Sequence, residues 1–248
     1  MCMPLRRHKE GWGISRGPAF RRGATASLYI LLCYIRAVNY SEKYLIRAKL
    51  AGRVLRFVPY LRLAALNGSI VRGEETKKSD IDIFIIARAG RLYTCRAFAT
   101  ALIHLTGWRR HGNRVAGRIC LNCYLSDYNP DIAPRDSKSR KKVAWAYKYM
   151  IPLVATPGVS EKFFRTNRWF DRFWVRGLNC QVKLRRQLTP KAPARPEYFL
   201  EFVLSGKFGW WFEKKLMGWQ RRRILAGKRP GDETVATKFE IRLHPKKH

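Results

Sequence analysis

Two aspartates, Asp80 and Asp82, lie one residue apart at the start of the apolar run "DIDIFIIA". Ionised side chains avoid apolar surroundings unless something compensates for their lost hydration. If this run is a strand, both carboxylates lie on one face, about 6.6 Å apart along it. Two such carboxylates repel each other, and one or two Mg²⁺ ions between them would remove that repulsion. Paired ions of this kind are the usual machinery for in-line displacement at phosphorus.

A Gly-Ser pair precedes these aspartates, at the end of the segment "YLRLAALNGS". The dipeptide Asn67-Gly68 is typical of a turn. Gly68 allows a backbone N–H to approach a phosphate closely, and the Ser69 hydroxyl adds a donor. The pair therefore indicates a site for a phosphate-bearing ligand beside the carboxylates.

Residues 68–83, "GSIVRGEETKKSDIDI", resemble the signature of the polymerase-β-like nucleotidyltransferase superfamily. The shared pattern is Gly-Ser, a short helical turn carrying Arg-Gly, and then Ser-Asp-hydrophobic-Asp. Its spacing is similar to that of the minimal nucleotidyltransferases, the group that includes antitoxin-type adenylyltransferases.

This resemblance implies transfer of a nucleoside monophosphate from an NTP, with ATP as the expected donor, and release of pyrophosphate. The acceptor would be a hydroxyl of an RNA end, a small molecule or a protein. Asp80 and Asp82 would be catalytic and would hold Mg²⁺ or Mn²⁺. The remaining polar positions of the motif would bind the nucleotide: Gly68, Ser69, Arg72 and Ser79. Arg72 would lie near the phosphates or pair with an acid.

A full site in this family usually has a third carboxylate on a neighbouring strand. The expected position, within "ICLNCY", holds Asn122, whose amide offers a metal one oxygen but no negative charge. Asp127 and Asp131 follow the same strand, although neither lies on the expected face. Three interpretations stay open: an enzyme with a variant third ligand, a nucleotide binder without turnover, or a misplaced third strand. We prefer the first.

The elements around the motif are predicted from periodicity. Apolar residues at helical spacing predict a helix over residues 41–58, which Pro59 ends. Residues 60–69 and "DIDIFIIA" are expected to be strands, residues 91–108 a helix, and "RICLNCYLS" a third strand. Beyond residue 131, the segments "KKVAWAYKYMIPLVA", "SEKFFRTNRWFDRFWV" and "PEYFLEFVLSGKFGWWFEKKLMGWQRRRILAG" are predicted to be helical.

The predicted fold is therefore α+β: a small mixed β-sheet nucleotidyltransferase domain flanked by helices, with a mainly helical C-terminal region. We divide the chain into a flexible basic arm over residues 1–23, the nucleotidyltransferase domain over 24–131, and a basic helical region over 132–248.

The charge balance is the unusual feature of the composition. Among 248 residues, 51 Lys and Arg face 17 Asp and Glu, a net charge of +34. Such an excess attracts RNA or another polyanion, although a basic proteome would also explain it. Residues 207–229 place eight basic residues among Trp210, Trp211, Phe212 and Trp219. These aromatics either stack bases or pack in the core, and we expect packing, with Phe199, Phe202, Trp210 and Trp219 on the face docked onto the sheet. A nucleic-acid-binding module without catalysis is thus the alternative function.

The cysteines and the apolar segments indicate where in the cell the protein is located. Six cysteines are too sparse for a disulfide framework in a chain of this length, which suits a reducing, cytoplasmic location. Cys120 and Cys123 have C-x-x-C spacing without a second ligand pair, so buried thiols are a better interpretation than zinc. The apolar stretch from Ala26 to Ile35 is too short for a transmembrane segment, which needs about 20 residues.

Overall fold

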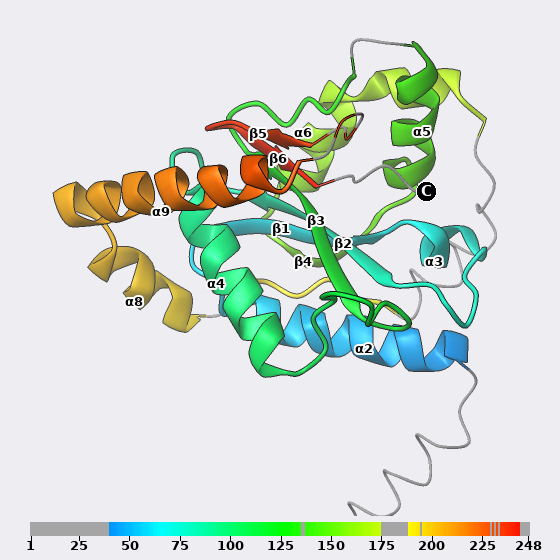
Figure 1. Cartoon of the computed structure of the whole chain (residues 1–248), viewed down its shortest axis with the longest axis horizontal. Helices are drawn as coiled ribbons and strands as arrows, with labels where there is room; N and C mark the ends of the chain where they lie inside the picture. Colours follow the sequence, from blue (N-terminus) through cyan, green and yellow to red (C-terminus); the bar gives the residue numbers. More distant parts are fainter. Residues whose placement is uncertain are drawn as a thin grey trace, which may run out of the picture. The chain divides into compact units, whose positions relative to one another are not determined.

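A mixed sheet of six strands lies at the centre of the part of the chain that the structure describes (Figure 1). The structure, a computed structural model, describes residues 40–134, 137–174, 188–193, 195–228, 230, 232 and 234–243. The predicted basic arm at 1–23 and the apolar stretch at 26–35 lie outside these residues. The strands are β1 (Leu61–Asn67), β2 (Ile81–Ala87), β3 (Ile119–Ser126), β4 (Ile151–Ala155), β5 (Val235–Ala236) and β6 (Glu240–Arg242).

The strand order is β4-β1-β2-β3-β6-β5, with β2 and β3 parallel and all other neighbours antiparallel. Helices cover both faces of the sheet (Figure 1). One face carries α2 (Tyr40–Leu55), α4 (Leu92–Leu105) and α9 (Gly206–Ala226). The other carries α5 (Ser137–Tyr147), α6 (Val159–Thr166) and the 3₁₀ helix η1 (Arg168–Arg172). The predicted α+β fold with a mixed sheet is confirmed.

The alternation of side chains along β2 explains why the sheet needs two apolar cores. Ile81, Ile83 and Ile85 are buried in the core under α2 and α4. Phe84 and Ile86 are buried in the core under α5 and α6. Because successive side chains on a strand point to opposite faces, Asp82 lies on the same face as Phe84, at the end of the strand. The carboxylate is therefore placed by the burial of its apolar neighbours.

The structure corrects the predicted helix over residues 141–155. Helix α5 ends at Tyr147, and Ile151–Ala155 forms β4, which pairs with β1 at the edge of the sheet. Pro152 accounts for the difference, because proline interrupts a helix but is tolerated in an edge strand. The short strands β5 and β6 were also not predicted. The sheet therefore takes strands from both sides of residue 131, and a boundary there remains a prediction.

Helix α9 docks onto α4 through buried polar side chains. The Glu213 carboxylate accepts hydrogen bonds from the N–H groups of Tyr93 and Thr94, at 2.8 and 2.7 Å. These are donors in the first turn of α4, whose own cap residue, Arg91, supplies no side-chain acceptor. Gln220 donates to the carbonyl of Tyr93 at 3.0 Å. Glu213 thus caps α4 from another helix and fixes how α9 lies on it.

The expectation that the C-terminal aromatics pack onto the sheet is wrong for four of them. Exposed fractions are 69% for Phe199, 76% for Phe202, 55% for Trp210 and 51% for Trp219. The apolar residues by which α9 contacts the core are Phe212, Leu216, Met217 and Ile224. The exposed rings on α9 therefore lie outside the core.

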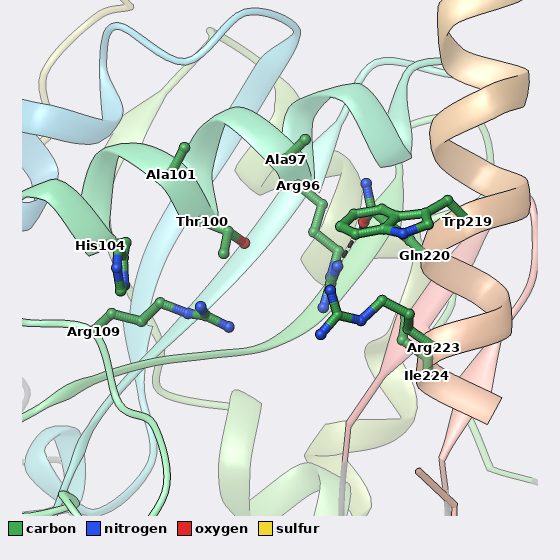
Figure 2. A pocket seen from close by; sticks show the side chains of 10 residues that line it. All are labelled: Arg96, Ala97, Thr100, Ala101, His104, Arg109, Trp219, Gln220, Arg223 and Ile224. Atoms are coloured by element: carbon green, nitrogen blue, oxygen red, sulfur yellow. Dashed lines mark hydrogen bonds between the residues drawn. The ribbon is translucent and has the colours of Figure 1, made fainter. Parts of the chain in front are cut away.

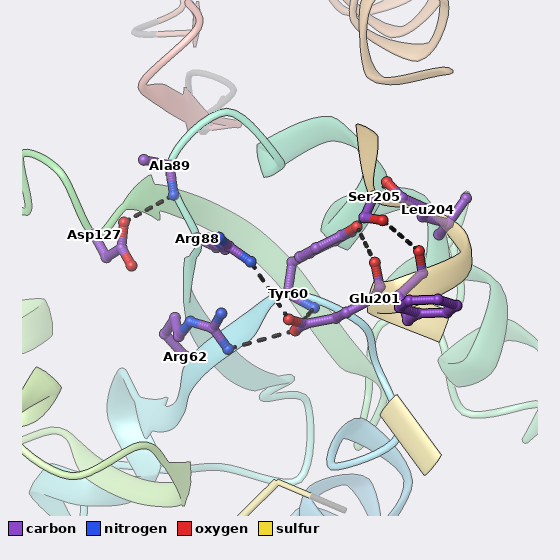
Figure 3. Close-up of polar contacts among 9 residues, drawn as sticks. Tyr60, Arg62, Arg88, Ala89, Asp127, Glu201, Leu204 and Ser205 are labelled. Carbon is purple, nitrogen blue, oxygen red and sulfur yellow. Dashed lines mark hydrogen bonds and ion pairs between the residues drawn. The ribbon is translucent and has the colours of Figure 1, made fainter. Parts of the chain in front are cut away.

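The Glu201 carboxylate and the Tyr60 hydroxyl hold helix α8 (Arg195–Val203) to the start of β1 (Figure 3). Glu201 accepts a 2.7 Å hydrogen bond from the N–H of Tyr60 and lies 3.4 Å from the guanidinium of Arg62. The Tyr60 hydroxyl donates to the carbonyls of Glu201 and Leu204, at 3.1 and 2.9 Å.

Among the described helices, none combines the length and apolar character needed to cross a membrane.

Candidate active site

Asp80 and Asp82 meet at the N-terminal end of β2, as the sequence predicted. Ligand atoms of Asp80, Asp82 and Cys120 all lie within 4.8 Å of one another, and all three residues are partly buried. Ile81, between the two aspartates, is fully buried on the opposite face. The two carboxylates are therefore held close together by the strand, and each needs a partner.

Two side chains compensate the carboxylates. The Arg110 guanidinium pairs with Asp80 Oδ2 at 2.5 Å. Asn122 Nδ2 donates a hydrogen bond to Asp82 Oδ1 at 2.9 Å. Asn122 therefore lies beside the aspartates, at the position where the family resemblance implied a third carboxylate. Arg110 was not predicted, because it comes from a loop thirty residues away in the sequence.

Strand β3 has a bulge beside the aspartates, at Asn122. Cys120 is paired with Asp82, but the next pairing joins Cys123 to Phe84, so that β3 has one more residue than β2 between them. Cys123 is fully buried in the core beside Phe84. Bulges often re-aim a side chain next to a functional site, and here Asn122 is the residue concerned.

Cys120 was predicted to be a structural thiol, and its contact with the site was missed. The available signal was the two-residue spacing to Asn122, which puts both on one strand face. Burial, together with the nearby carboxylates of Asp82 and Asp80, raises the pKa of the Cys120 thiol to about 12. The sulfur thus stays protonated at neutral pH, and a thiol is a poor metal ligand compared with a thiolate.

Gly68 lies where no other residue would fit. Its φ of +76° is in the left-handed region, and a Cβ added there would lie 2.4 Å from Asp82 Oδ2. Its N–H donates to the carbonyl of Ala146 in α5 at 3.3 Å. Ser69 then begins the short helix α3 (Ser69–Arg72), and its hydroxyl makes no hydrogen bond to another described residue. Gly68 thus lets the backbone approach the Asp82 carboxylate, and Ser69 leaves a donor available.

Arg72 and Ser79 hold the segment between β1 and β2. Arg72 Nε pairs with Glu74 at 2.7 Å, and its guanidinium donates to the carbonyl of Trp145 at 3.1 Å. Of the two predicted roles for Arg72, the pairing with an acid is the one seen. Ser79 Oγ accepts from the Thr76 N–H at 2.9 Å and closes the turn that precedes Asp80.

One open cavity of about 690 Å³ unites these positions, a volume typical of a ligand site. All six residues predicted from the motif line it: Gly68, Ser69, Arg72, Ser79, Asp80 and Asp82. The lining has four basic side chains, Arg72 from the motif and three others: Lys78, Arg110 and Lys142. Basic groups thus outnumber the two carboxylates, which suits a ligand with several negative charges. Trp145, 41% exposed, adds an aromatic ring that the sequence analysis did not assign to the site.

The two alternative acids lie elsewhere. Asp127 follows the C-terminal end of β3 and accepts a 2.8 Å hydrogen bond from the Ala89 N–H (Figure 3). Asp131 Oδ1 accepts from the Ala133 N–H at 2.8 Å. Because the cluster lies at the opposite end of β3, neither carboxylate replaces the third acid.

Residues 47–149 match the family model described as a nucleotidyltransferase domain. Over these residues the chain is similar to that family. The nucleotidyltransferase domain contains every side chain that lines the carboxylate cavity, and the match confirms the resemblance of the motif to polymerase-β-like enzymes. No curated protein and no solved structure significantly matches the chain.

Proposed function

We propose that this nucleotidyltransferase domain transfers a nucleoside monophosphate from an NTP, with ATP as the expected donor, to a hydroxyl acceptor. The observation that carries the proposal is the meeting of Asp80 and Asp82 beside Gly68 and Ser69 in a basic cavity. In the reaction the acceptor oxygen forms a bond to the α-phosphorus, the bond to the bridging oxygen breaks, and pyrophosphate leaves.

The oxygen atoms of the cluster fit a hard divalent cation. Asp80 and Asp82 supply carboxylates, and Asn122 Oδ1 is buried without a hydrogen-bond partner among the described residues. Oxygen donors of this kind suit Mg²⁺ or Mn²⁺, whereas the protonated Cys120 thiol does not. A bound cation would neutralise charge that develops on the phosphates. Asp80, Asp82 and Asn122 are the residues that would hold it.

The basic side chains that line the cavity support the binding of a triphosphate. Lys78 and Lys142 have no ion pair with a described residue and line the cavity beside Ser69. An incoming triphosphate would also offer Arg110 an anionic partner other than Asp80. The ring of Trp145, which lies 5.7 Å from the Arg72 guanidinium, would lie beside the nucleotide.

The acceptor hydroxyl must lose its proton as it attacks. Asn122 has no site for this proton because an amide is not a base at neutral pH. Within the cluster, the carboxylates of Asp80 and Asp82 are the groups able to take it. The variant third position therefore shifts proton transfer to the same residues that would bind the cation.

Two observations favour a second candidate, a nucleotide-binding protein without turnover. The Asp80 carboxylate is already neutralised by Arg110, and Asn122 brings no charge to the site. Both features would lower the affinity for a cation relative to three carboxylates. The six cysteines, too sparse for a disulfide framework in a chain of this length, support a reducing, cytoplasmic location for either function.

Transfer of label from α-labelled NTPs, with pyrophosphate release measured in parallel, tests the proposal. We expect release only with Mg²⁺ or Mn²⁺. Asp80→Asn and Asp82→Asn should each lower the rate by at least about 100-fold, because they remove groups that act on the transition state. Asp171→Asn is the matched control, since Asp171 is exposed on η1 and lies outside the cavity.

Three outcomes are informative. Loss of activity in both site variants but not in the control supports the enzyme. Equal activity in all variants contradicts the catalytic assignment. Metal-independent NTP binding without pyrophosphate release favours the second candidate.

A further inference from the structure

A second cavity, of about 580 Å³, lies between α4 and α9 (Figure 2). Arg96, Thr100 and His104 line it from α4, and Trp219 and Arg223 line it from α9. Arg109 enters from the loop after α4. Figure 2 shows the guanidinium groups of Arg96, Arg109 and Arg223 directed into the same space. The nucleotidyltransferase motif includes none of these residues.

No carboxylate among the described lining residues balances the positive charge in this cavity. Glu213, two turns before Gln220 on α9, is bound to the N-terminus of α4. Arg96 donates to Gln220 Oε1 at 2.5 Å, but its Nε is buried without a hydrogen-bond partner in the described part of the chain. Converging like charges and an unsatisfied buried donor are both unfavourable, and an anion bound in the cavity would remove the repulsion between the charges.

The cavity also offers an aromatic surface. The Trp219 ring is 51% exposed, and the guanidinium of Arg223 lies 5.1 Å from its centroid. Arginine beside an exposed tryptophan is suited to a ligand that joins a phosphate to a planar base. The chemistry of the lining therefore indicates a nucleotide unit rather than an inorganic anion alone.

A third, smaller cavity shares lining residues with this site and with the cavity at the carboxylates. It has a volume of about 270 Å³ and is lined by Arg109 and Arg110 together with Cys120 and Asn122. Arg109 also lines the cavity at Trp219, and Arg110 also lines the cavity at Asp80. Adjacent arginines thus line a series of three neighbouring cavities, the last of which is the candidate active site.

We infer that these cavities bind a single-stranded nucleic acid, with a base at Trp219 and backbone phosphates along Arg223, Arg96 and Arg109. The series of cavities leads the strand toward Asp80 and Asp82, so that its terminal hydroxyl becomes the acceptor. The acceptor assignment rests on the proposed function, whereas the binding site does not. A strand is favoured over a free nucleotide because the basic lining continues beyond the space that one nucleotide fills.

Fluorescence anisotropy with labelled oligoribonucleotides and oligodeoxyribonucleotides of about 12 residues tests the binding site. The measurement is made in EDTA over a range of salt concentrations. Arg109→Gln and Arg223→Gln should each weaken binding by about fivefold or more and reduce the salt slope by about 0.7. Trp219→Ala should weaken binding by about tenfold, with little change in the salt slope.

Matched controls separate this site from general attraction to a basic surface. Arg165→Gln removes an exposed arginine from α6, and Trp211→Ala removes an exposed ring two turns before Trp219 on α9. Both should bind within about twofold of the unmodified protein. Equal weakening by the controls would overturn the inference, as would binding of the strand no tighter than that of AMP, which would indicate a free-nucleotide site.

Extension of the oligonucleotide by an NTP separates this inference from the proposed function. If strand binding depends on Arg109 and Trp219 but no extension occurs with Mg²⁺, the binding site stands and the acceptor assignment fails. If extension occurs, Trp219→Ala should raise the KM for the strand with kcat nearly unchanged. Extension that is insensitive to Arg109→Gln and Trp219→Ala would overturn the inference and leave the enzyme assignment intact.

Discussion

The side-chain amide of Asn122 donates a hydrogen bond to the carboxylate of Asp82 across 2.9 Å. The neutral amide thus occupies the neighbouring-strand position at which a third carboxylate was expected, and it lowers the repulsion within the cluster when no cation is bound.

Asn122→Asp should make the protein depend on a divalent cation for stability. Three carboxylates in one cluster repel one another, so we expect a loss of about 1–4 kcal/mol in EDTA. Added Mn²⁺ should restore more stability than in the unmodified protein. Thermal unfolding with and without Mn²⁺ measures both effects, and Asn129→Asp, in an exposed loop, is the control. An unchanged response to Mn²⁺ would argue against a cation at this position.

Arg110→Gln should strengthen cation binding. Arg110 and a metal compete for Asp80, so removing the guanidinium should lower the Kd for Mn²⁺ in isothermal titration. Without metal the variant should lose about 1 kcal/mol, because the ion pair is partly exposed. Arg114→Gln changes an exposed arginine of the same loop and should alter neither quantity. Weaker Mn²⁺ binding in Arg110→Gln would contradict the competition.

Gly68→Ala should damage the site through a clash as well as through backbone strain. Gly90 has a similar φ, +70°, but no atom lies within 4 Å of a Cβ added there. Gly90→Ala should therefore show the backbone cost alone, about 1 kcal/mol, whereas Gly68→Ala should lose more and also bind Mn²⁺ more weakly. Urea unfolding compares the two variants, and equal losses would mean that Asp82 moves aside readily.

Tyr93→Phe should flatten the loss of stability at high pH. Burial raises the pKa of Tyr93 to about 12, and its hydroxyl donates to the Thr237 carbonyl at 2.8 Å. Between about pH 10 and 12, the unfolded chain releases this proton while the folded chain keeps it, so the free energy of unfolding falls as pH rises.

Urea unfolding from pH 7 to 11.5 measures this effect. Tyr93→Phe should cost about 1 kcal/mol at pH 7 from the lost hydrogen bond, and its stability should then fall less steeply above pH 10. Tyr128→Phe, at a ring that is 71% exposed, should follow the unmodified protein. Parallel curves for Tyr93→Phe and the unmodified protein would contradict the assignment.

Local patterns were sufficient to predict most of the site. The alternation along β2 placed Asp80 and Asp82 on one face, and the resemblance to the nucleotidyltransferases pointed to Asn122 as their neighbour. The rule also puts Cys120 on that face, but its residue type suggested a structural thiol. Arg110 could not be predicted, because only the fold brings its loop to β2.

The errors in the predicted secondary structure also have physical reasons. Pro152 was a readable signal against a helix, and the strand β4 forms because the edge of β1 is available to it. The strands β5 and β6 are too short to show periodicity. On α9, hydrophobicity suggested that Trp219 packs inward, whereas Glu213 and Gln220 determine which side of the helix faces α4.

Crystals grown with Mn²⁺ and a non-hydrolysable ATP analogue test the central claim most directly. We predict an anomalous peak about 2.1 Å from carboxylate oxygens of both Asp80 and Asp82, with the triphosphate beside Ser69. Absence of that peak, with Arg110 still paired to Asp80 while the analogue is bound, would contradict it.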